Sequence, residues 1–259
     1  MDEDYQTYLN RVARMTLLET YNSQLQHIQE SPKFQLNPAG EIQAVPFPGY
    51  TIITPPAEED PQNEDFYQKL QLCQQQLQLI DPNLIVPLPA ASFHLTLADL
   101  IWDSAFRYAT QSPDFEVQLG NCIAQIFQQC RQFITKTNGI VWQMLGLFVM
   151  PRAIGVCLIP QDESSYAQIL KFRRTIYQSS GLTALGIEQH YRFTPHITLG
   201  YFGKLPANLD RDRLSNSLSK LNQQLLENSS PFLVQRAELR KFDDMTRYYR
   251  KSDWATLDF

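Results

Sequence analysis

The sequence has little of what usually marks a cofactor site or a disulfide framework. Its 259 residues include four cysteines, ten glycines and four histidines, with no CxxC pair and no glycine-rich loop of the GxGxxG or GxxxxGK type. Scattered single cysteines are typical of small core residues in a reducing compartment. The missing glycine loops exclude the two common motifs that bind nucleotide phosphates.

Long apolar runs and an excess of positive charge are also missing. Residues 140–160 are the most apolar stretch, but Gln143, Pro151 and Arg152 interrupt them, which argues against a membrane-spanning helix. The first residues are acidic and lack the apolar centre of a signal peptide. A net charge of −5 argues against a protein that coats long nucleic acid, whereas a short substrate or an RNA end is still allowed. We therefore expect a cytoplasmic protein without a membrane partner.

Apolar periodicity predicts helices that alternate with strands along the whole chain. The expected helices cover residues 4–29, 62–80, 114–136, 164–181 and 208–227. The expected extended segments are a hairpin over 33–45 and strands within 47–54, 84–97, 140–150, 154–160, 194–200 and 232–250. This order predicts an α+β fold, with an N-terminal helical extension over residues 1–32 and a single domain over 33–259.

Two short segments share one unusual pattern. Residues 92–98 read SFHLTLA and residues 194–200 read TPHITLG. Because side chains alternate between the two faces of a strand, His94 and Thr96 should share one face, and so should His196 and Thr198. Each segment also ends in a small residue, Ala98 or Gly200, which the same alternation places on the polar face. A lone histidine of this kind is usually a structural residue, but two matched segments suggest one shared site.

Paired histidines and threonines fit the chemistry of a phosphodiester. Two imidazoles with ordinary pKa values near 6.5 can act as general base and general acid at neutral pH. Two threonine hydroxyls can donate hydrogen bonds to the non-bridging phosphate oxygens. This pattern needs no metal, so we expect neither a metal nor another cofactor.

These two HxTx motifs resemble those of the 2H phosphoesterase superfamily. The segment RFTPHITLGYF (192–202) is similar to the C-terminal motif of that superfamily, and FHLTLADL (93–100) with PFPGYT (46–51) resembles an uncharacterised bacterial branch of it. The final segment LRKFDDM (239–245) is similar to the last strand of the family. In arrangement the resemblance covers roughly residues 33–250, but its specific residues are confined to the two motifs.

The resemblance implies a bilobal fold with two pseudo-symmetric lobes, whose antiparallel sheets face a central cleft and carry helices outside. It also implies metal-independent hydrolysis of a cyclic (2′,3′-type) or 2′-linked phosphodiester of RNA or a nucleotide. By this analogy His94 and His196 are catalytic, and Thr96 and Thr198 bind the phosphate. The analogy favours His196 as the base and His94 as the acid.

Further residues could contact the substrate. Arg192 and His190 share strand parity with His196, although both could belong to a preceding loop. Tyr201 could stack on a base, although its parity with Leu199 favours the core. Tyr50 could line the cleft or pack the strand. The C-terminal segment mixes basic and aromatic residues that could hold a nucleic-acid strand or form a solvated face; these are Arg236, Arg240, Lys241, Arg247, Tyr248, Tyr249, Arg250, Lys251 and Trp254.

Three other interpretations compete with a phosphoesterase. The first is a non-catalytic module that binds phosphorylated nucleotides or RNA ends in the same cleft, although an intact set of two histidines and two threonines argues against it. The second is a metal hydrolase, but HxxxH and HxH spacings are missing and only Asp99 and Asp103 lie near a motif in sequence. The third is a protein that recruits a partner through its N-terminal helix. The oligomeric state is left open.

Overall fold

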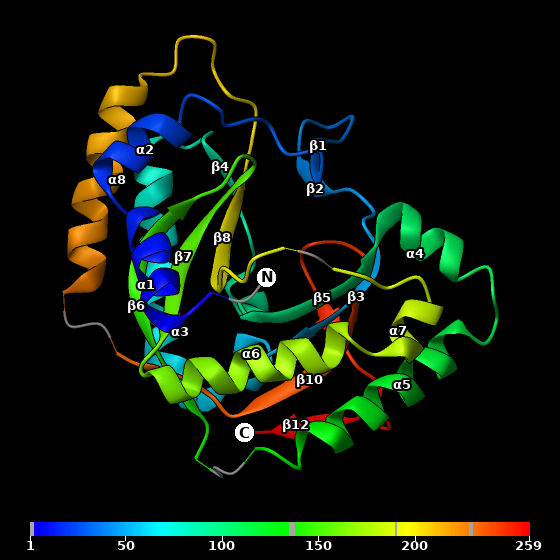
Figure 1. Cartoon of the computed structure of the whole chain (residues 1–259). Helices are drawn as coiled ribbons and strands as arrows, with labels where there is room; N and C mark the ends of the chain where they lie inside the picture. Colours follow the sequence, from blue (N-terminus) through cyan, green and yellow to red (C-terminus); the bar gives the residue numbers. More distant parts are fainter. Residues whose placement is uncertain (1–2, 135–137, 190, 228–229) are drawn as a thin grey trace.

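The computed structural model describes residues 3–134, 138–189, 191–227 and 230–259. Two five-stranded antiparallel sheets and a separate two-stranded hairpin form the β-structure of these residues. Helices flank both sheets (Figure 1). The predicted α+β class is therefore confirmed.

The first sheet gathers strands from both ends of the chain. Its order is β11 (Tyr248–Tyr249), β10 (Arg236–Phe242), β3 (Gly49–Ile53) and β5 (Thr96–Trp102), and β12 (Thr256–Asp258) also pairs with β10. The helices α4 (Asp103–Ala109), α5 (Phe115–Cys130), α6 (Glu163–Tyr177) and α7 (Ser180–Ala184) lie on its side of the molecule (Figure 1). This sheet carries the first motif.

The second sheet has the order β4 (Ile85–Pro87), β8 (His196–Phe202), β7 (Ala153–Pro160), β6 (Ile140–Val149) and β9 (Phe232–Val234). The helices α3 (Glu64–Ile80) and α8 (Arg211–Leu226) contact it, and it carries the second motif. Each sheet therefore mixes strands from both halves of the sequence, so neither sheet corresponds to one half of the chain.

The N-terminal segment contains two helices where the sequence predicted one over 4–29. Helix α1 (Tyr5–Arg14) begins at the N-cap Asp4 and packs against β7 and α6, whereas α2 (Leu18–Gln24) packs against α8. The extended backbone of Leu17 separates them. Tyr8 and Tyr21 are fully buried, and the Tyr21 hydroxyl donates to the Leu147 carbonyl at 2.9 Å. The two helices are therefore packed into the fold.

Most other elements lie close to their predicted positions. The hairpin consists of β1 (Phe34–Leu36) and β2 (Ile42–Ala44), and short 3₁₀ turns occupy Ala57–Glu59, Pro61–Asn63 and Ala90–Ser92. Helix α4 was not predicted; it follows β5 directly through Asp103, whose φ of 49° turns the chain sharply. None of the helices in the described part of the chain has the length and apolarity needed to cross a bilayer.

Candidate active site

A cleft of about 330 Å³ lies between the two sheets, and both motifs line it. Its described walls combine the two histidines and two threonines with a lysine, an aspartate and several apolar or aromatic side chains. They are Lys33, Phe47, Thr51, Leu88, Ser92, His94, Thr96, Asp99, Trp102, His196, Thr198, Tyr201, Phe242, Met245 and Tyr248. The structure thus brings His94, Thr96, His196 and Thr198 together in one cleft.

Strand alternation accounts for this convergence. In β8 the side chains of Ile197 and Leu199 are fully buried on one face of the strand. His196 and Thr198 lie on the other face, which lines the cleft. In the first motif β5 begins only at Thr96, so His94 lies just before the strand. Leu95 and Leu97 are nevertheless fully buried, and the alternation extends back to His94.

The alternation changes phase directly after each threonine. A register shift in the pairing of β5 with β3 leaves Leu97 without a partner, so Ile52 pairs with Ala98 and Thr51 with Asp99. Such a bulge reverses the faces of the residues that follow it. Asp99 therefore faces the cleft, and Ala98 is fully buried rather than on the polar face.

Strand β8 contains a bulge of the same kind. The shift between Ile154 and Gly155 leaves Leu199 without a partner in β7, so Gly200 is buried and Tyr201 faces the cleft. The parity argument that favoured core packing for Tyr201 fails for this reason. Both motifs thus present a histidine, a threonine and, three residues after the threonine, one more polar side chain.

The two imidazoles are held in the same way. Nδ1 of His94 lies 2.7 Å from the carbonyl oxygen of Ser92, and Nδ1 of His196 lies 2.8 Å from that of Thr194. A carbonyl oxygen can only accept a hydrogen bond, so each Nδ1 carries a proton. In a neutral ring Nε2 is then the unprotonated nitrogen and can accept or relay a proton.

The electrostatic surroundings of the two histidines differ. Burial lowers the pKa of His94 to about 4; the Ser92 carbonyl opposes this shift, whereas the nearby charges of His196 and Arg240 add to it. Burial also lowers the pKa of His196, but the Thr194 carbonyl and the negative charge of Asp99 counteract that shift. His196 is therefore the imidazole that is more easily protonated.

Lys33 is a cleft residue that the sequence did not reveal. Its ammonium group contacts the Tyr201 hydroxyl at 3.3 Å and the Met245 sulfur at 3.1 Å, and it lies 4.3 Å from the centre of the Phe47 ring. Burial lowers its pKa to about 8, while the charge of Asp99 opposes that shift. Lys33 precedes the hairpin in a segment without any motif, so no sequence signal pointed to it.

An aromatic ring packs against each histidine. The Tyr248 ring lies 4.2 Å from that of His94, and the Phe148 ring lies 5.6 Å from that of His196. Arg240 is buried in ion pairs with Glu238 and Glu59.

Two expected substrate contacts lie outside the cleft. Arg192 is exposed and pairs with Glu3 at 3.1 Å. Tyr50 is 1% exposed; its hydroxyl donates to Glu116 at 2.6 Å, and its ring packs against Phe106. His190 lies outside the described residues.

Some of the basic side chains in the C-terminal segment are held in ion pairs. Arg236 pairs with Asp258 at 2.7 Å, and Lys251 pairs with Glu116. Within the described residues, no group of three or more histidine, cysteine or acidic side chains is arranged to hold a metal ion.

Comparisons with known proteins show a similar structure but no similar sequence. No family model and no curated protein matches the sequence. The structure is similar to that of a conserved protein of unknown function from Agrobacterium tumefaciens, with a TM-score of 0.63, 16% identity, and coverage of 89% of this chain and 96% of that chain. A crystal structure described as a phosphoesterase aligns with 83% of this chain and 100% of that chain at 16% identity, and its TM-score of 0.37 is too low to indicate a shared fold.

Proposed function

We propose that this chain is a phosphoesterase of the 2H type that hydrolyses a cyclic (2′,3′-type) or 2′-linked phosphodiester of a nucleotide or an RNA end. The observation that supports it most strongly is that two histidines with the same Nδ1 anchoring, each followed by a threonine, line one cleft from two different sheets. Such a pair can move two protons in one reaction.

In the proposed reaction a water molecule attacks the phosphorus of the bound diester. Nε2 of one histidine removes a proton from the water as the new P–O bond forms. Nε2–H of the other histidine gives its proton to the ribose oxygen as the old P–O bond breaks. The products are a phosphomonoester and a free hydroxyl group, and the two imidazoles have exchanged protonation states.

The charges around the cleft suggest which histidine has which role. Both imidazoles are neutral in the empty cleft because burial lowers the pKa of each. A bound phosphodiester anion would raise both pKa values. Asp99 adds to that effect at His196, so we assign His196 as the acid and His94 as the base, the reverse of the order that the family resemblance favoured.

The other polar groups would bind the phosphate. The hydroxyls of Thr96 and Thr198 face the same space and can donate to the non-bridging oxygens. The ammonium group of Lys33 would balance the negative charge that develops on them. Tyr248 and Tyr201 supply aromatic surface for a ribose or a base.

A substrate panel tests this proposal. We expect the protein, in the presence of EDTA, to hydrolyse at least one of the 2′,3′-cyclic nucleotides, RNA ending in a cyclic phosphate, or 2′,5′-oligonucleotides. Phosphomonoesters and 3′,5′-linked RNA serve as matched controls and should stay intact. A folded protein that hydrolyses none of the first group would contradict the proposal and favour the module that binds phosphorylated ends.

A further inference from the structure

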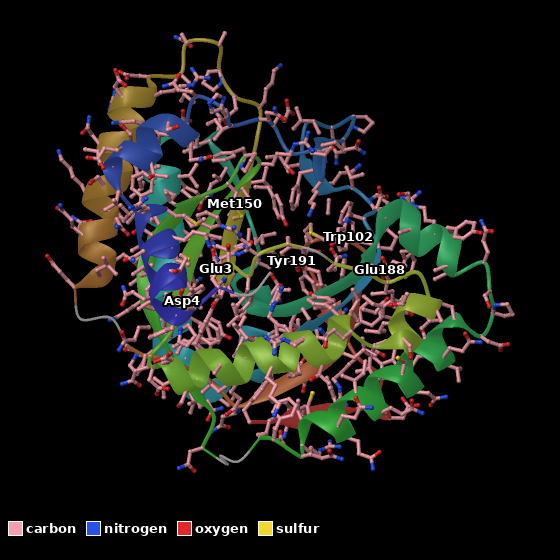
Figure 2. The ribbon with its side chains drawn as sticks, viewed as in Figure 1. Glu3, Asp4, Trp102, Met150, Glu188 and Tyr191 are labelled. Carbon is pink, nitrogen blue, oxygen red and sulfur yellow. The ribbon has the colours of Figure 1, made fainter. Side chains whose placement is uncertain are left out.

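A second hollow, of about 450 Å³, lies beside the cleft and carries the opposite balance of charge to the protein as a whole. Its described walls include helix α6, Gln189 and residues 191–193, and Glu3 closes one side; in Figure 2, Glu3 and Tyr191 mark it. Its described lining includes the arginines Arg173, Arg174 and Arg192 and one carboxylate, that of Glu3. We call it the arginine pocket.

Arg173 is the fixed centre of the arginine pocket. It is 5% exposed, and its guanidinium donates to the Leu97 carbonyl. The same group lies over three aromatic rings, 4.2 Å from the centre of Phe193, 5.2 Å from that of Tyr177 and 5.4 Å from that of Tyr191. In the described part of the chain, no carboxylate forms an ion pair with it.

A buried guanidinium without a counter-ion is costly to maintain. Ring faces compensate for only part of that cost. An anion that enters the pocket would supply the missing partner. The position of Arg173 therefore points to an anionic ligand.

Glu3, whose carboxylate lines the pocket, already forms ion pairs with two arginines. Glu3 pairs with Arg192 through Nη1 at 3.1 Å and with Nε of Arg11 at 2.9 Å. Arg11 lies outside the pocket wall, so the negative charge of Glu3 is divided between the pocket and the helix behind it. The pocket stays positive in a protein whose net charge is −5.

We propose that the arginine pocket binds a nucleoside monophosphate, with its phosphate group on the arginines and its base against Tyr191. Guanidinium forks match the spacing of phosphate oxygens and can bind them in pairs. The volume is in the range of pockets for ligands of this size. Tyr191 is 45% exposed and offers an aromatic surface to a base. The side-chain amides of Gln178 and Gln189 can pair with the polar edge of that base.

This site is distinct from the cleft but adjoins it. The Tyr191 hydroxyl donates to the carboxylate of Asp99, and Asp99 lines the cleft. A base that stacks on Tyr191 would therefore contact the residue that holds Asp99 in place. Binding in the arginine pocket does not depend on whether the cleft is catalytic.

Isothermal titration of the full chain with AMP tests the proposal. The pocket variant is Arg174→Gln with Arg192→Gln, because both side chains are exposed. The matched control is Arg213→Gln with Lys220→Gln, which removes the same charge from exposed positions on α8. The cleft variant is Thr96→Ala with Thr198→Ala. Thermal unfolding confirms that each variant is folded.

We expect AMP to bind the wild type, the control and the cleft variant, and at least tenfold more weakly to the pocket variant. Adenosine, which lacks the phosphate, should bind the wild type at least tenfold more weakly than AMP. The proposal is overturned if the wild type binds no AMP, if the pocket variant binds as the wild type does, or if the cleft variant loses all binding.

Discussion

Asp99 and His196 face the same cleft from different sheets, and the carboxylate of Asp99 opposes the effect of burial on the imidazole. Burial lowers the pKa of His196, and the negative charge of Asp99 raises it. Asp99 is itself held by the Tyr191 hydroxyl. The aspartate thus makes His196 the histidine of the pair that is more ready to carry a proton.

Replacing Asp99 by asparagine should lower the pKa of His196 further. The Asp99→Asn variant keeps the size of the side chain but removes the charge that favours the imidazolium. NMR titration of the His196 ring protons measures the pKa directly. Asp103→Asn, on the exposed start of α4, is the control and should leave it unchanged. A His196 pKa that stays the same or rises in Asp99→Asn would contradict the electrostatic account.

Lys33 should strengthen the binding of the phosphodiester. The Lys33→Met variant retains the apolar stem but loses the ammonium group, so KM should rise by roughly tenfold to a hundredfold, the range for a hydrogen bond to a charged group. Because the pKa of Lys33 is about 8, kcat/KM of the wild type should fall more steeply above about that pH than loss of the histidine acid alone requires, and this additional fall should be absent in Lys33→Met. Lys204→Met, an exposed lysine on another loop, should behave as the wild type; an unchanged KM in Lys33→Met would exclude the assigned role.

Arg11 of helix α1 should hold His196 in position through the two residues, Phe193 and Thr194, that it contacts. Its guanidinium donates to the Phe193 carbonyl at 2.7 Å and to the Thr194 hydroxyl at 2.9 Å, and the Thr194 carbonyl accepts the Nδ1 proton of His196. Arg11→Ala should therefore reduce kcat by about tenfold or more, with a smaller change in KM. Arg14→Ala, an exposed arginine on the same helix, is the control.

A change in thermal stability alone would not identify this role, because Arg11 also pairs with Glu3. The kcat/KM profile against pH adds a second readout, in which the limb that reports His196 should shift in Arg11→Ala. Arg11→Lys should restore only part of kcat, since an ammonium group cannot donate to both oxygens in the same fork geometry. Equal losses in Arg11→Ala and Arg14→Ala would contradict the positioning role.

The half-buried His94 should make the folded state less stable in acid. Its pKa is about 4 in the folded chain because of burial, and near 6.5 when unfolded. Between these values the unfolded state binds more protons, so stability falls as the pH drops from about 6.5 to 4. The loss is at most about 3 kcal/mol for this one group, given 1.36 kcal/mol per pKa unit. Urea unfolding at several pH values should show a smaller pH dependence in His94→Gln, and an identical slope in both proteins would be inconsistent with a neutral buried imidazole.

The sequence predicted that each histidine shares a face with its threonine, because that depends on the alternation of apolar side chains. Ile197 and Leu199 had to be buried, which left His196 and Thr198 on the other face. The bulges after Thr96 and Thr198 could not be predicted, because they depend on the register with β3 and β7. Asp99 was therefore considered only as a possible metal ligand, and parity favoured the core for Tyr201, although a substrate contact was left open.

The roles of residues that reach the site from distant segments also could not be predicted from the sequence. Lys33 enters the cleft from the residue before the hairpin, and Arg11 reaches the His196 segment from an N-terminal helix. Their roles depend on tertiary contacts across more than 150 residues. Tyr50 shows the reverse case, since a residue inside a motif-like segment packs in the core against α4 and α5.

The central claim is that His94 and His196 act together on one phosphodiester. The most direct test is kcat on the best cyclic or 2′-linked substrate for the wild type, His94→Ala, His196→Ala and the double variant, with His27→Ala as an exposed control. We predict a loss of roughly 10²- to 10⁴-fold in each single cleft variant, with a double variant hardly slower than either, because the residues act as a unit. Full activity in either single variant would contradict the paired-histidine site.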